Sequence, residues 1–335
     1  MVRGMEADWP DRGQALELCG RVRCPVLVVQ GTHDRIVGPA RGPAVAKAIP
    51  GAGLLVLEGS GHAPHLRDPV RFNLELSRFL GAPPQAARTR TRAHGRPRKA
   101  LFVSSPIGLG HTQRDIAIAR ELRKLVPGLQ IDWLAQDPVT RVLDTSGERI
   151  HPASLELASE SLHIESESAE HDLHCFQAIC RMDEILVANF MLFHDVATTE
   201  PYDLWIADEG WDVDYFLHEN PELKTAAYCW LTNFVGWIPM PAGGDREAFL
   251  TADYNAEMIG HIARYPRLRD RAIFVGNPGD IVPGTFGQDL PGIRDWTEDH
   301  YDFTGYITGF DPTASPTATG SAPSLATGRT SRCAS

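Results

Sequence analysis

The sequence lacks the long apolar segments that membrane-spanning or exported proteins carry. None of its apolar runs approaches the ~18 residues that a transmembrane helix needs. The N-terminal stretch MVRGMEADWPDRGQ contains no apolar core of the kind found in signal peptides. Hydrophobic residues make up 43% of the chain and charged residues 22%, which is typical of a soluble globular protein. We therefore expect a cytoplasmic protein with no integral membrane segment.

Metal-binding cysteine motifs are also absent. The chain has six cysteines, but Cys19 and Cys24 are five residues apart, as are Cys175 and Cys180, so neither pair is a C-x-x-C. Reduced or buried thiols are the better interpretation. We expect no metal, no disulfide and no cofactor.

Positive charge is scarce over a long part of the chain, whose net charge is −11. Residues 151–219 hold sixteen acidic residues and a single basic one, Arg181. Residues 88–99 hold six basic residues but no interleaved aromatic residues, which nucleic-acid-binding segments often have. A solvated linker is the better interpretation, and we expect no nucleic-acid partner.

The patterning divides the chain into α/β segments, a linker and a tail. Residues 1–81 and 100–311 alternate apolar strands with helices, which predicts parallel sheets in both. Residues 82–99 are rich in Pro, Arg and Ala and predict an interdomain linker. Residues 312–335 consist mainly of Ser, Thr, Ala, Gly and Pro, and we expect them to be disordered.

Each segment has a definite predicted order of elements. In the first, strands are expected at 25–31 and 53–59 and helices at 38–51 and 68–81, with Asp68 as the N-cap of the last helix. In the second, strands are expected at 100–105, 129–135, 202–210, 224–230 and 271–278, and helices at 116–125, 171–196 and 245–266. The second segment is therefore predicted to be one Rossmann-like domain with a mostly parallel sheet.

An acid and a histidine follow the two predicted strands of the first segment. Asp34 lies in GTHD and His62 in GSGH, so both fall at the carboxyl ends of parallel strands, where α/β sheets build their sites. The stretches CPVLVVQGTHDRIVGP and LLVLEGSGHAPHLRDPVRFNLELSRFL resemble the C-terminal end of the α/β-hydrolase fold. The resemblance implies Asp34 as the acid and His62 as the base of a Ser-His-Asp triad.

The nucleophile that such a triad needs is absent from the sequence. No G-x-S-x-G elbow occurs, and Ser60 lies only two residues before His62. We therefore interpret the first segment as a partial hydrolase lobe. An alternative is an ester or amide hydrolase whose nucleophile lobe is missing or supplied in trans by a complementary domain.

A glycine turn with a histidine opens the second segment. In SSPIGLGHTQRD, Gly108 and Gly110 permit a tight turn, and His111 falls near a helix N-terminus, where the helix dipole disfavours the imidazolium. The motif lacks the third glycine of G-x-G-x-x-G and is not a P-loop. Asp208 ends a later predicted strand, with Glu209 directly after it.

These features resemble the N-terminal, acceptor-binding domain of GT-B glycosyltransferases, the two-Rossmann-domain class that includes UDP-glycosyltransferases. The resemblance rests on ALFVSSPIGLGHTQRDIAIARELRK, DLWIADEGW and DWTEDHYDFTGYITGFDP. It implies that His111 is the general base on the acceptor hydroxyl and Asp208 its partner, with Glu209 as the alternative partner. Trp230, Phe234 and Trp237 could line an acceptor pocket or belong to the core.

The resemblance implies a bifunctional hydrolase–glycosyltransferase parent. Its reaction would be inverting transfer of a sugar from a nucleotide-sugar donor to an acceptor hydroxyl. No second glycine-rich site or sugar-binding motif occurs in the sequence, so we expect this chain alone to have little or no activity. A non-catalytic binding module that uses the acidic surface of residues 151–219 is a further alternative.

Overall fold

The computed structural model describes residues 12–81, 96–168 and 173–308. The chain divides into two compact units, residues 1–89 and 90–335. The predicted tail and most of the predicted linker lie outside the described residues. None of the described helices is both long enough and apolar enough to cross a lipid bilayer.

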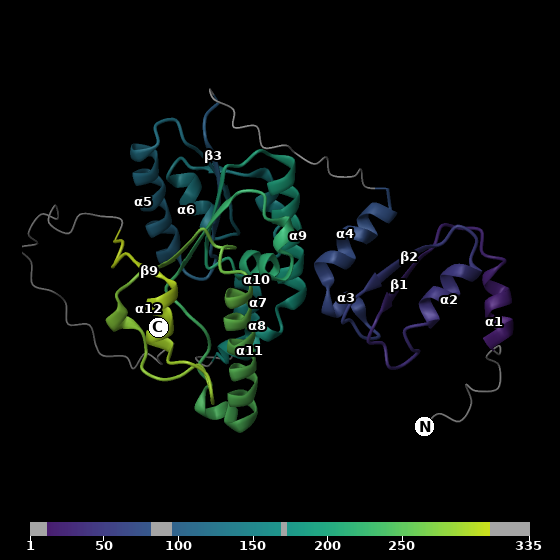
Figure 1. Cartoon of the computed structure of the whole chain (residues 1–335). Helices are drawn as coiled ribbons and strands as arrows, with labels where there is room; N and C mark the ends of the chain where they lie inside the picture. The colour runs from purple at the N-terminus through teal and green to yellow at the C-terminus, as the bar shows by residue number, and fades with distance from the viewer. Residues whose placement is uncertain (1–11, 82–95, 169–172, 309–335) are drawn as a thin grey trace, which may run out of the picture. The chain divides into compact units, whose positions relative to one another are not determined.

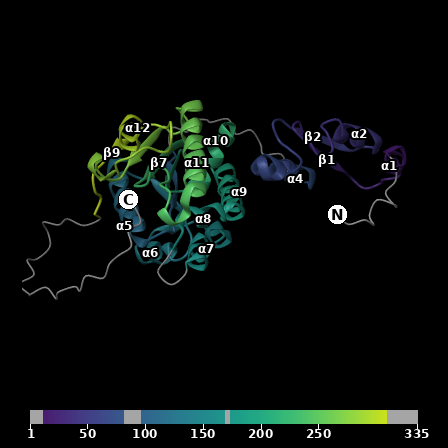
Figure 2. The ribbon, with the colours of Figure 1, turned by 90° about the horizontal axis from the view of Figure 1, so that it is seen from below.

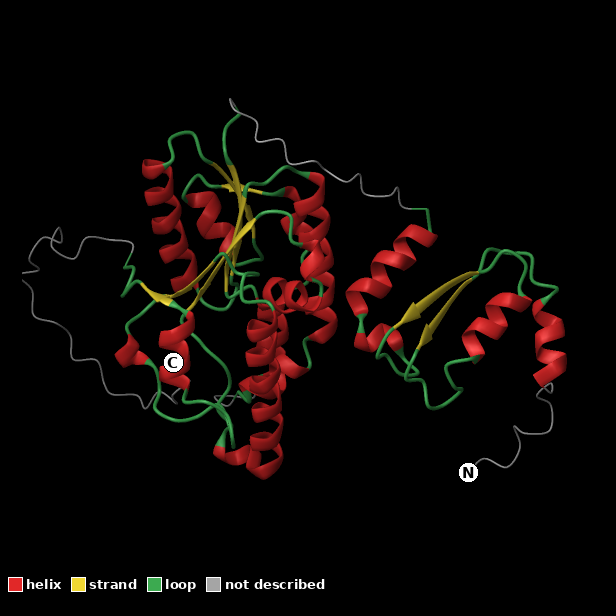
Figure 3. Cartoon of the chain, viewed as in Figure 1, coloured by secondary structure: helices red, strands yellow, loops and turns green. Residues whose placement is uncertain are grey.

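The first unit is a two-stranded parallel sheet with helices (Figure 3). Its strands pair in register from Leu27 opposite Gly53 to Gly31 opposite Leu57, as the sequence predicts for parallel strands. A weakly amphipathic helix and a single helical turn, α1 and α3, were not predicted. The elements are α1 (Arg12–Cys19), β1 (Leu27–Gly31), α2 (Arg41–Ala48), β2 (Gly53–Leu57), α3 (Pro64–Arg67) and α4 (Pro69–Phe79).

Two loops at the carboxyl ends of β1 and β2 approach each other closely. The backbone N–H of His33 donates to the backbone oxygen of Ser60 over 2.9 Å. A Cβ on Gly31 would lie 2.2 Å from that same oxygen, so only glycine fits there. Asp68 is the N-cap residue of α4, as predicted, but its side chain makes no cap hydrogen bond because its carboxylate accepts the Ser60 hydroxyl instead.

The second unit is a Rossmann-like α/β domain around a seven-stranded parallel sheet of order β5-β4-β3-β6-β7-β8-β9. The predicted fold class, α/β with a mostly parallel sheet, is confirmed. The strands are β3 (Lys99–Ser104), β4 (Gln130–Leu134), β5 (Arg149–Ile150), β6 (Leu204–Asp208), β7 (Ala227–Thr232), β8 (Arg271–Phe274) and β9 (Asp302–Phe303). The helices are α5 (Leu109–Leu125), α6 (Val139–Thr145), α7 (Glu160–Glu167), α8 (Cys175–Cys180), α9 (Asp183–Thr199), α10 (Trp211–Glu219), α11 (Gly244–Arg264) and α12 (Ile293–His300).

The strand order places helices on both faces of this sheet. Helices α5 and α6 lie on one side, and α9 and α10 on the other (Figures 1 and 2). The core under α5 and α6 includes Phe102 and Trp133, whose rings stack with centroids 4.4 Å apart. Because β3 and β6 are neighbours, the sheet reverses its order between them, and the carboxyl ends of these strands flank the crevice where such folds bind ligands.

The prediction of one continuous helix at 171–196 is wrong. The described part forms two helices, α8 and α9, which separate at Arg181 and Met182. Met182 is buried and Arg181 turns to Glu167, with 2.5 Å between Nη1 and Oε2. The break also lets Phe176 of α8 pack against Trp237, at 5.7 Å between ring centroids. Tertiary packing therefore overrides the helical period of the sequence.

The last residues of the predicted linker belong to the second unit. Lys99 begins β3, and its ammonium lies 2.7 Å from Glu200. Arg96 binds both carboxylate oxygens of Asp203, at 2.9 and 2.7 Å. Strands β3 and β6 run parallel, so the basic residues at the start of β3 lie next to the acidic residues that precede β6. The side chains of Arg96 and Lys99 are therefore held in ion pairs.

We expect Gly31→Ala to destabilise the first unit by about 2 kcal/mol or more, because the added methyl group would collide with the backbone of Ser60. Gly61→Ala is the matched control, since a Cβ there meets open space. Amide hydrogen exchange of the β1 and β2 strands measures the difference. Equal protection in the two variants would show that the loops are not packed as described.

Candidate functional site

The candidate site lies at the carboxyl ends of β3 and β6. Ser104, the last residue of β3, pairs in register with Asp208, the last residue of β6. The chain then turns through Gly108, whose φ of +103° is a conformation that glycine adopts readily, and α5 begins at Leu109. This turn places the first turn of α5 directly over the end of β6.

His111 and Asp208 meet there, as expected from the resemblance. His111 lies in the first turn of α5, and its Nδ1 is 3.0 Å from Oδ2 of Asp208. Asp208 is fully buried, whereas the imidazole is 15% exposed. A Cβ on Gly110 would meet open space, so no close approach requires glycine at that position.

Arg114 is a third member of this cluster that the sequence analysis missed. Its Nε donates to Oδ2 of Asp208 over 3.1 Å, and its Nη2 donates to Oδ1 of the same carboxylate. Nη2 also lies 2.9 Å from Nδ1 of His111. A carboxylate is a stronger acceptor than a neutral imidazole nitrogen, so we assign the Nδ1 proton to the bond with Asp208. That tautomer leaves the lone pair on Nε2.

The ionisation of the cluster follows from its burial and its partners. Although burial opposes it, the hydrogen bond from His111 and the charge of Arg114 lower the pKa of Asp208. Burial and the charge of Asp208 raise the pKa of Asp115 well above its usual range, which favours its neutral form. The Ser104 hydroxyl donates to Asp115 over 2.6 Å.

The missed residues carry a signal in the sequence. His111, Arg114 and Asp115 are spaced i, i+3 and i+4, so they share one helix face. Polar residues on the helix face that packs against a sheet are unusual. The spacing alone could have indicated a charged cluster that includes Arg114.

Glu209 occupies the other side of His111. Its Oε2 lies 3.8 Å from Nε2 of His111, and its Oε1 accepts hydrogen bonds from the Thr232 hydroxyl and the Asn233 backbone N–H at 3.2 and 3.1 Å. Its φ of +48° is a left-handed conformation that is rare for residues other than glycine, and such strain is often found at functional sites. Burial raises the pKa of Glu209. A carboxyl group is thus fixed beside the nitrogen that would take a proton.

A cavity opens next to Glu209. It is small, with a volume of about 20 Å³, and lies between the ends of β3, β4 and β6 and the helices α7 and α9. Its walls are partly apolar, with Val103, Leu134 and Phe193, and partly acidic, with Glu160 and Asp212 in addition to Glu209. The cavity and the His111 cluster therefore share one wall residue, Glu209.

Two buried acids of this cavity were not predicted from the sequence. Glu160 is 8% exposed and Asp212 6%. Burial and the nearby charge of Glu160 raise the pKa of Asp212 to about 8. Burial also raises the pKa of Glu160, although the hydrogen bonds from Gln136 and Asn189 act in the opposite direction. The pair therefore carries less than two negative charges near neutral pH.

Of the three aromatic residues considered for an acceptor pocket, Trp230 lies in β7, and Phe234 and Trp237 follow that strand. Trp230 is fully buried. The centroid of its ring lies 5.1 Å from that of Trp211 and 5.2 Å from the guanidinium carbon of Arg269. Phe234 and Trp237 pack edge to face at 4.9 Å. None of the three predicted aromatics lines the cavity beside Glu209. Trp230 is thus a core residue, the second of the two interpretations that the sequence left open.

The first unit also brings its predicted pair together. Nδ1 of His62 lies 3.0 Å from Oδ2 of Asp34, and the imidazole is 49% exposed. Burial by itself would raise the pKa of Asp34, but the hydrogen bonds from His62 and from backbone amides outweigh it and lower the pKa to about 2. Ser60 is fully buried and donates its hydroxyl to Asp68, so it is not available to His62 as a nucleophile.

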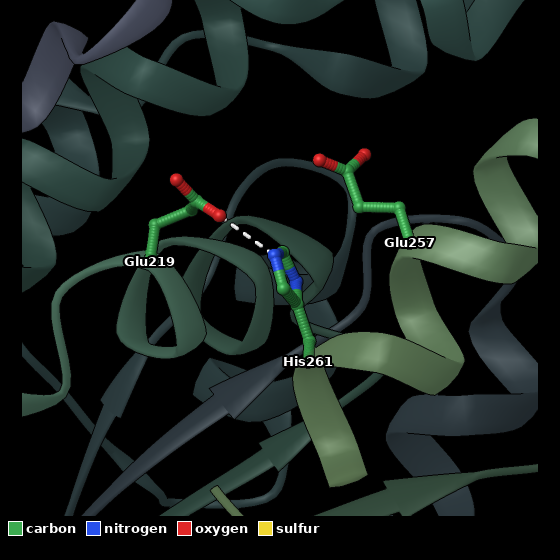
Figure 4. Close-up of side chains that lie close together, drawn as sticks. All are labelled: Glu219, Glu257 and His261. Carbon is green, nitrogen blue, oxygen red and sulfur yellow. Dashed lines mark ion pairs between the residues drawn. The ribbon is translucent and has the colours of Figure 1, made fainter. Parts of the chain in front are cut away.

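One group of side chains has the composition of a cation site. Glu219 of α10 and Glu257 and His261 of α11 place possible ligand atoms within 4.8 Å of one another (Figure 4). Nε2 of His261 already pairs with Oε1 of Glu219 at 2.6 Å, and the Tyr215 hydroxyl lies 3.4 Å from Oε1 of Glu257. These contacts explain the cluster as a junction between the two helices, and we assign no metal to it.

Comparisons with known proteins find only partial similarity. No protein-family model matches the chain. It is 36% identical over 62 residues to "Putative carbamate hydrolase RutD" of Pseudomonas savastanoi pv. phaseolicola, covering 18% of this chain and 24% of that protein. It is 40% identical over 78 residues to "Uncharacterized protein Rv2715" of Mycobacterium tuberculosis, covering 22% of each chain. The chain thus spans about a quarter or less of these relatives.

Three similar solved structures are glycosyltransferases. The kitacinnamycin glycotransferase matches with a TM-score of 0.39 and 14% identity, over 69% of this chain and 56% of that one. The calicheamicin glycosyltransferase CalG4 matches with a TM-score of 0.34 and 14% identity, over 63% and 52%. SnogD from Streptomyces nogalater matches with a TM-score of 0.34 and 15% identity, over 59% and 50%. At these TM-scores the matches carry no argument about function, which has to come from the site itself.

We expect Asp208→Asn to destabilise the second unit by about 3–5 kcal/mol, because it leaves the buried charge of Arg114 unpaired. The double variant Asp208→Asn with Arg114→Met removes both charges and should recover most of that loss. Urea unfolding followed by tryptophan fluorescence measures both, since six of the seven tryptophans belong to the second unit. Equal destabilisation of the single and double variants would contradict a buried ion pair.

The raised pKa of Asp212 has a consequence for stability. Protonated Asp212 contributes stability that is complete below the ordinary value of 3.8 and is lost as the pH rises to about 8. Asp212→Asn, which resembles the protonated acid, should therefore raise the Tm more at pH 8 than at pH 5. Thermal unfolding at the two pH values tests this, with exposed Asp299→Asn as the control. An equal gain at both pH values would mean that Asp212 is ionised throughout.

Proposed function

We propose that the second unit is the acceptor-binding half of an inverting GT-B glycosyltransferase. The observation that carries the proposal is the His111–Asp208 pair at the point where the strand order reverses. The pair has the geometry of a general base held by a carboxylate. The donor would be a nucleotide sugar, whose nucleotide is held by a second Rossmann domain, on the same longer polypeptide or on another.

In the proposed reaction, His111 acts as the base through its Nε2 atom. Nε2 takes the proton of an acceptor hydroxyl as that oxygen attacks the anomeric carbon of the sugar. The bond from that carbon to the nucleotide diphosphate breaks, and the diphosphate leaves with its electron pair. Asp208 holds the Nδ1 proton and stabilises the imidazolium that forms.

A second candidate function rests on the first unit. Asp34 and His62 have the acid–base geometry of a hydrolase triad, and Ser60 does not supply the nucleophile. Leu54 and Val56 of β2 are 43% and 37% exposed, although the faces of parallel sheets are usually covered. These features favour a partial α/β-hydrolase lobe that another domain completes with the serine. The parent would then be a bifunctional hydrolase–glycosyltransferase with the domain limits predicted from the sequence.

The test of the main proposal is sugar transfer followed by mass spectrometry. The chain is incubated with UDP- and dTDP-hexoses and a panel of phenols and alcohols, with and without a separately supplied nucleotide-binding Rossmann domain. We expect transfer only with that domain, and a loss of about 10²–10⁴-fold in His111→Asn, because the base is removed.

The control is His300→Asn on α12, whose imidazole stacks on Trp296 at 4.3 Å. This variant should transfer sugar at the rate of the unmodified chain. Unchanged transfer in His111→Asn would refute the role of His111 as the base.

A further inference from the structure

Two hydrogen-bond acceptors face each other at the carboxyl end of β6. Nε2 of His111 and Oε2 of Glu209 lie 3.8 Å apart, and both atoms are accessible from solvent. Within the described residues, neither atom makes a hydrogen bond. In contrast, Nδ1 of the imidazole is held by Asp208, and Oε1 of the carboxyl group by the Thr232 hydroxyl and the Asn233 backbone N–H. Each side chain is therefore fixed through one polar atom and presents the other to solvent.

The backbone of Glu209 brings its carboxyl group to this place. Successive residues of a strand point to opposite faces of the sheet, so a regular strand would direct Glu209 away from the side of Asp208. Its φ of +48° is a left-handed conformation that few residues other than glycine adopt. Its backbone N–H donates to the carbonyl of Leu231, and its carbonyl accepts the N–H of Trp211, both over 2.9 Å. The two successive carboxyl groups therefore approach the two nitrogens of one imidazole.

The hydrogen-bonding character of this pair indicates what it can bind. Nε2 with its lone pair and the carboxyl oxygen are both acceptors, and one hydroxyl group has a single proton to donate. A single hydroxyl therefore leaves one of the two acceptors without a donor. Two hydroxyl groups on adjacent carbons can donate one hydrogen bond to each, because the acceptors are only 3.8 Å apart. A hydrogen bond to a carboxylate is also stronger than one between neutral groups.

We propose that Glu209 selects acceptors with two adjacent hydroxyl groups, one of which donates to Nε2 of His111 and the other to Oε2 of Glu209. The inference rests on the proposed function, because the hydroxyl at Nε2 is the one that attacks the sugar donor. The substrate class is thus a vicinal diol, as found in a catechol or a sugar. An acceptor without the second hydroxyl leaves the carboxyl oxygen unpaired, and sites built in this way discriminate against such analogues.

The test compares catechol with 2-methylphenol, in which a methyl group replaces the second hydroxyl. Dissociation constants are measured at pH 7 with the whole chain, from the ring signal of His111 in two-dimensional NMR of isotope-labelled histidine. The loss of that signal in His111→Asn assigns it. We expect catechol to bind about tenfold more tightly, because it adds a hydrogen bond to a charged group. Equal binding, tighter binding of 2-methylphenol, or no response of the His111 signal to catechol would overturn the proposal.

Two variants locate the second hydroxyl. Glu209→Asn keeps a residue that tolerates the left-handed backbone but shortens the side chain and removes its charge, and Glu209→Gly removes the side chain altogether. Each should abolish the preference for catechol while 2-methylphenol binds as before. Glu121→Gln, on the same helix as His111 but with a side chain that is 65% exposed, is the matched control and should keep the preference. A preference that survives both Glu209 variants would refute the role of Glu209.

The outcome separates this inference from the proposed function. The preference for a diol is read from binding alone, whereas the role of His111 as the base is read from transfer. A preference that depends on Glu209, together with unchanged transfer in His111→Asn, would refute the base and keep the assignment of Glu209. Loss of transfer in His111→Asn together with equal binding of the two phenols would keep the base and refute the diol.

Discussion

A fully buried carboxylate, Asp208, is the constraint on which the second unit depends. It ends a central strand, where no water can solvate its charge, so cationic or hydrogen-bonding partners have to come from the protein. Both partners, His111 and Arg114, come from the first turns of α5. The requirement of one buried charge therefore fixes how α5 lies on the sheet. The orientation of the imidazole is a consequence of that packing.

The acids around the crevice divide into two kinds. The buried charge of Asp208 is paired within the protein, and burial beside that charge raises the pKa of Asp115, which favours its neutral form. Glu160 is held by the amides of Gln136 and Asn189, and Asp212 accepts the backbone N–H of Val213. The first kind positions the imidazole of His111, and the second lines the small cavity beside Glu209.

The sequence predicted the sheet and the pair at its edge, because strands are short apolar runs and the residues after them meet at one edge. The resemblance to GT-B glycosyltransferases implied the pairing of His111 with Asp208, and their positions at strand ends made it geometrically plausible. Arg114 could have been found from its helical spacing. Glu160 and Asp212 could not, because α7 and α10 meet only through tertiary packing, which also breaks the predicted helix into α8 and α9.

The two units hold the same acid–histidine pair in different settings. The distance between Nδ1 and the carboxylate is 3.0 Å in both, but His62 is 49% exposed and His111 15%. Asp34 is completed by backbone amides near its own strand end, whereas Asp208 is completed by an arginine from another element. Asp208 and Arg114 therefore hold His111 in a buried cluster, whereas His62 lies exposed at the end of a two-stranded sheet. For that reason the proposed sugar transfer is assigned to the second unit.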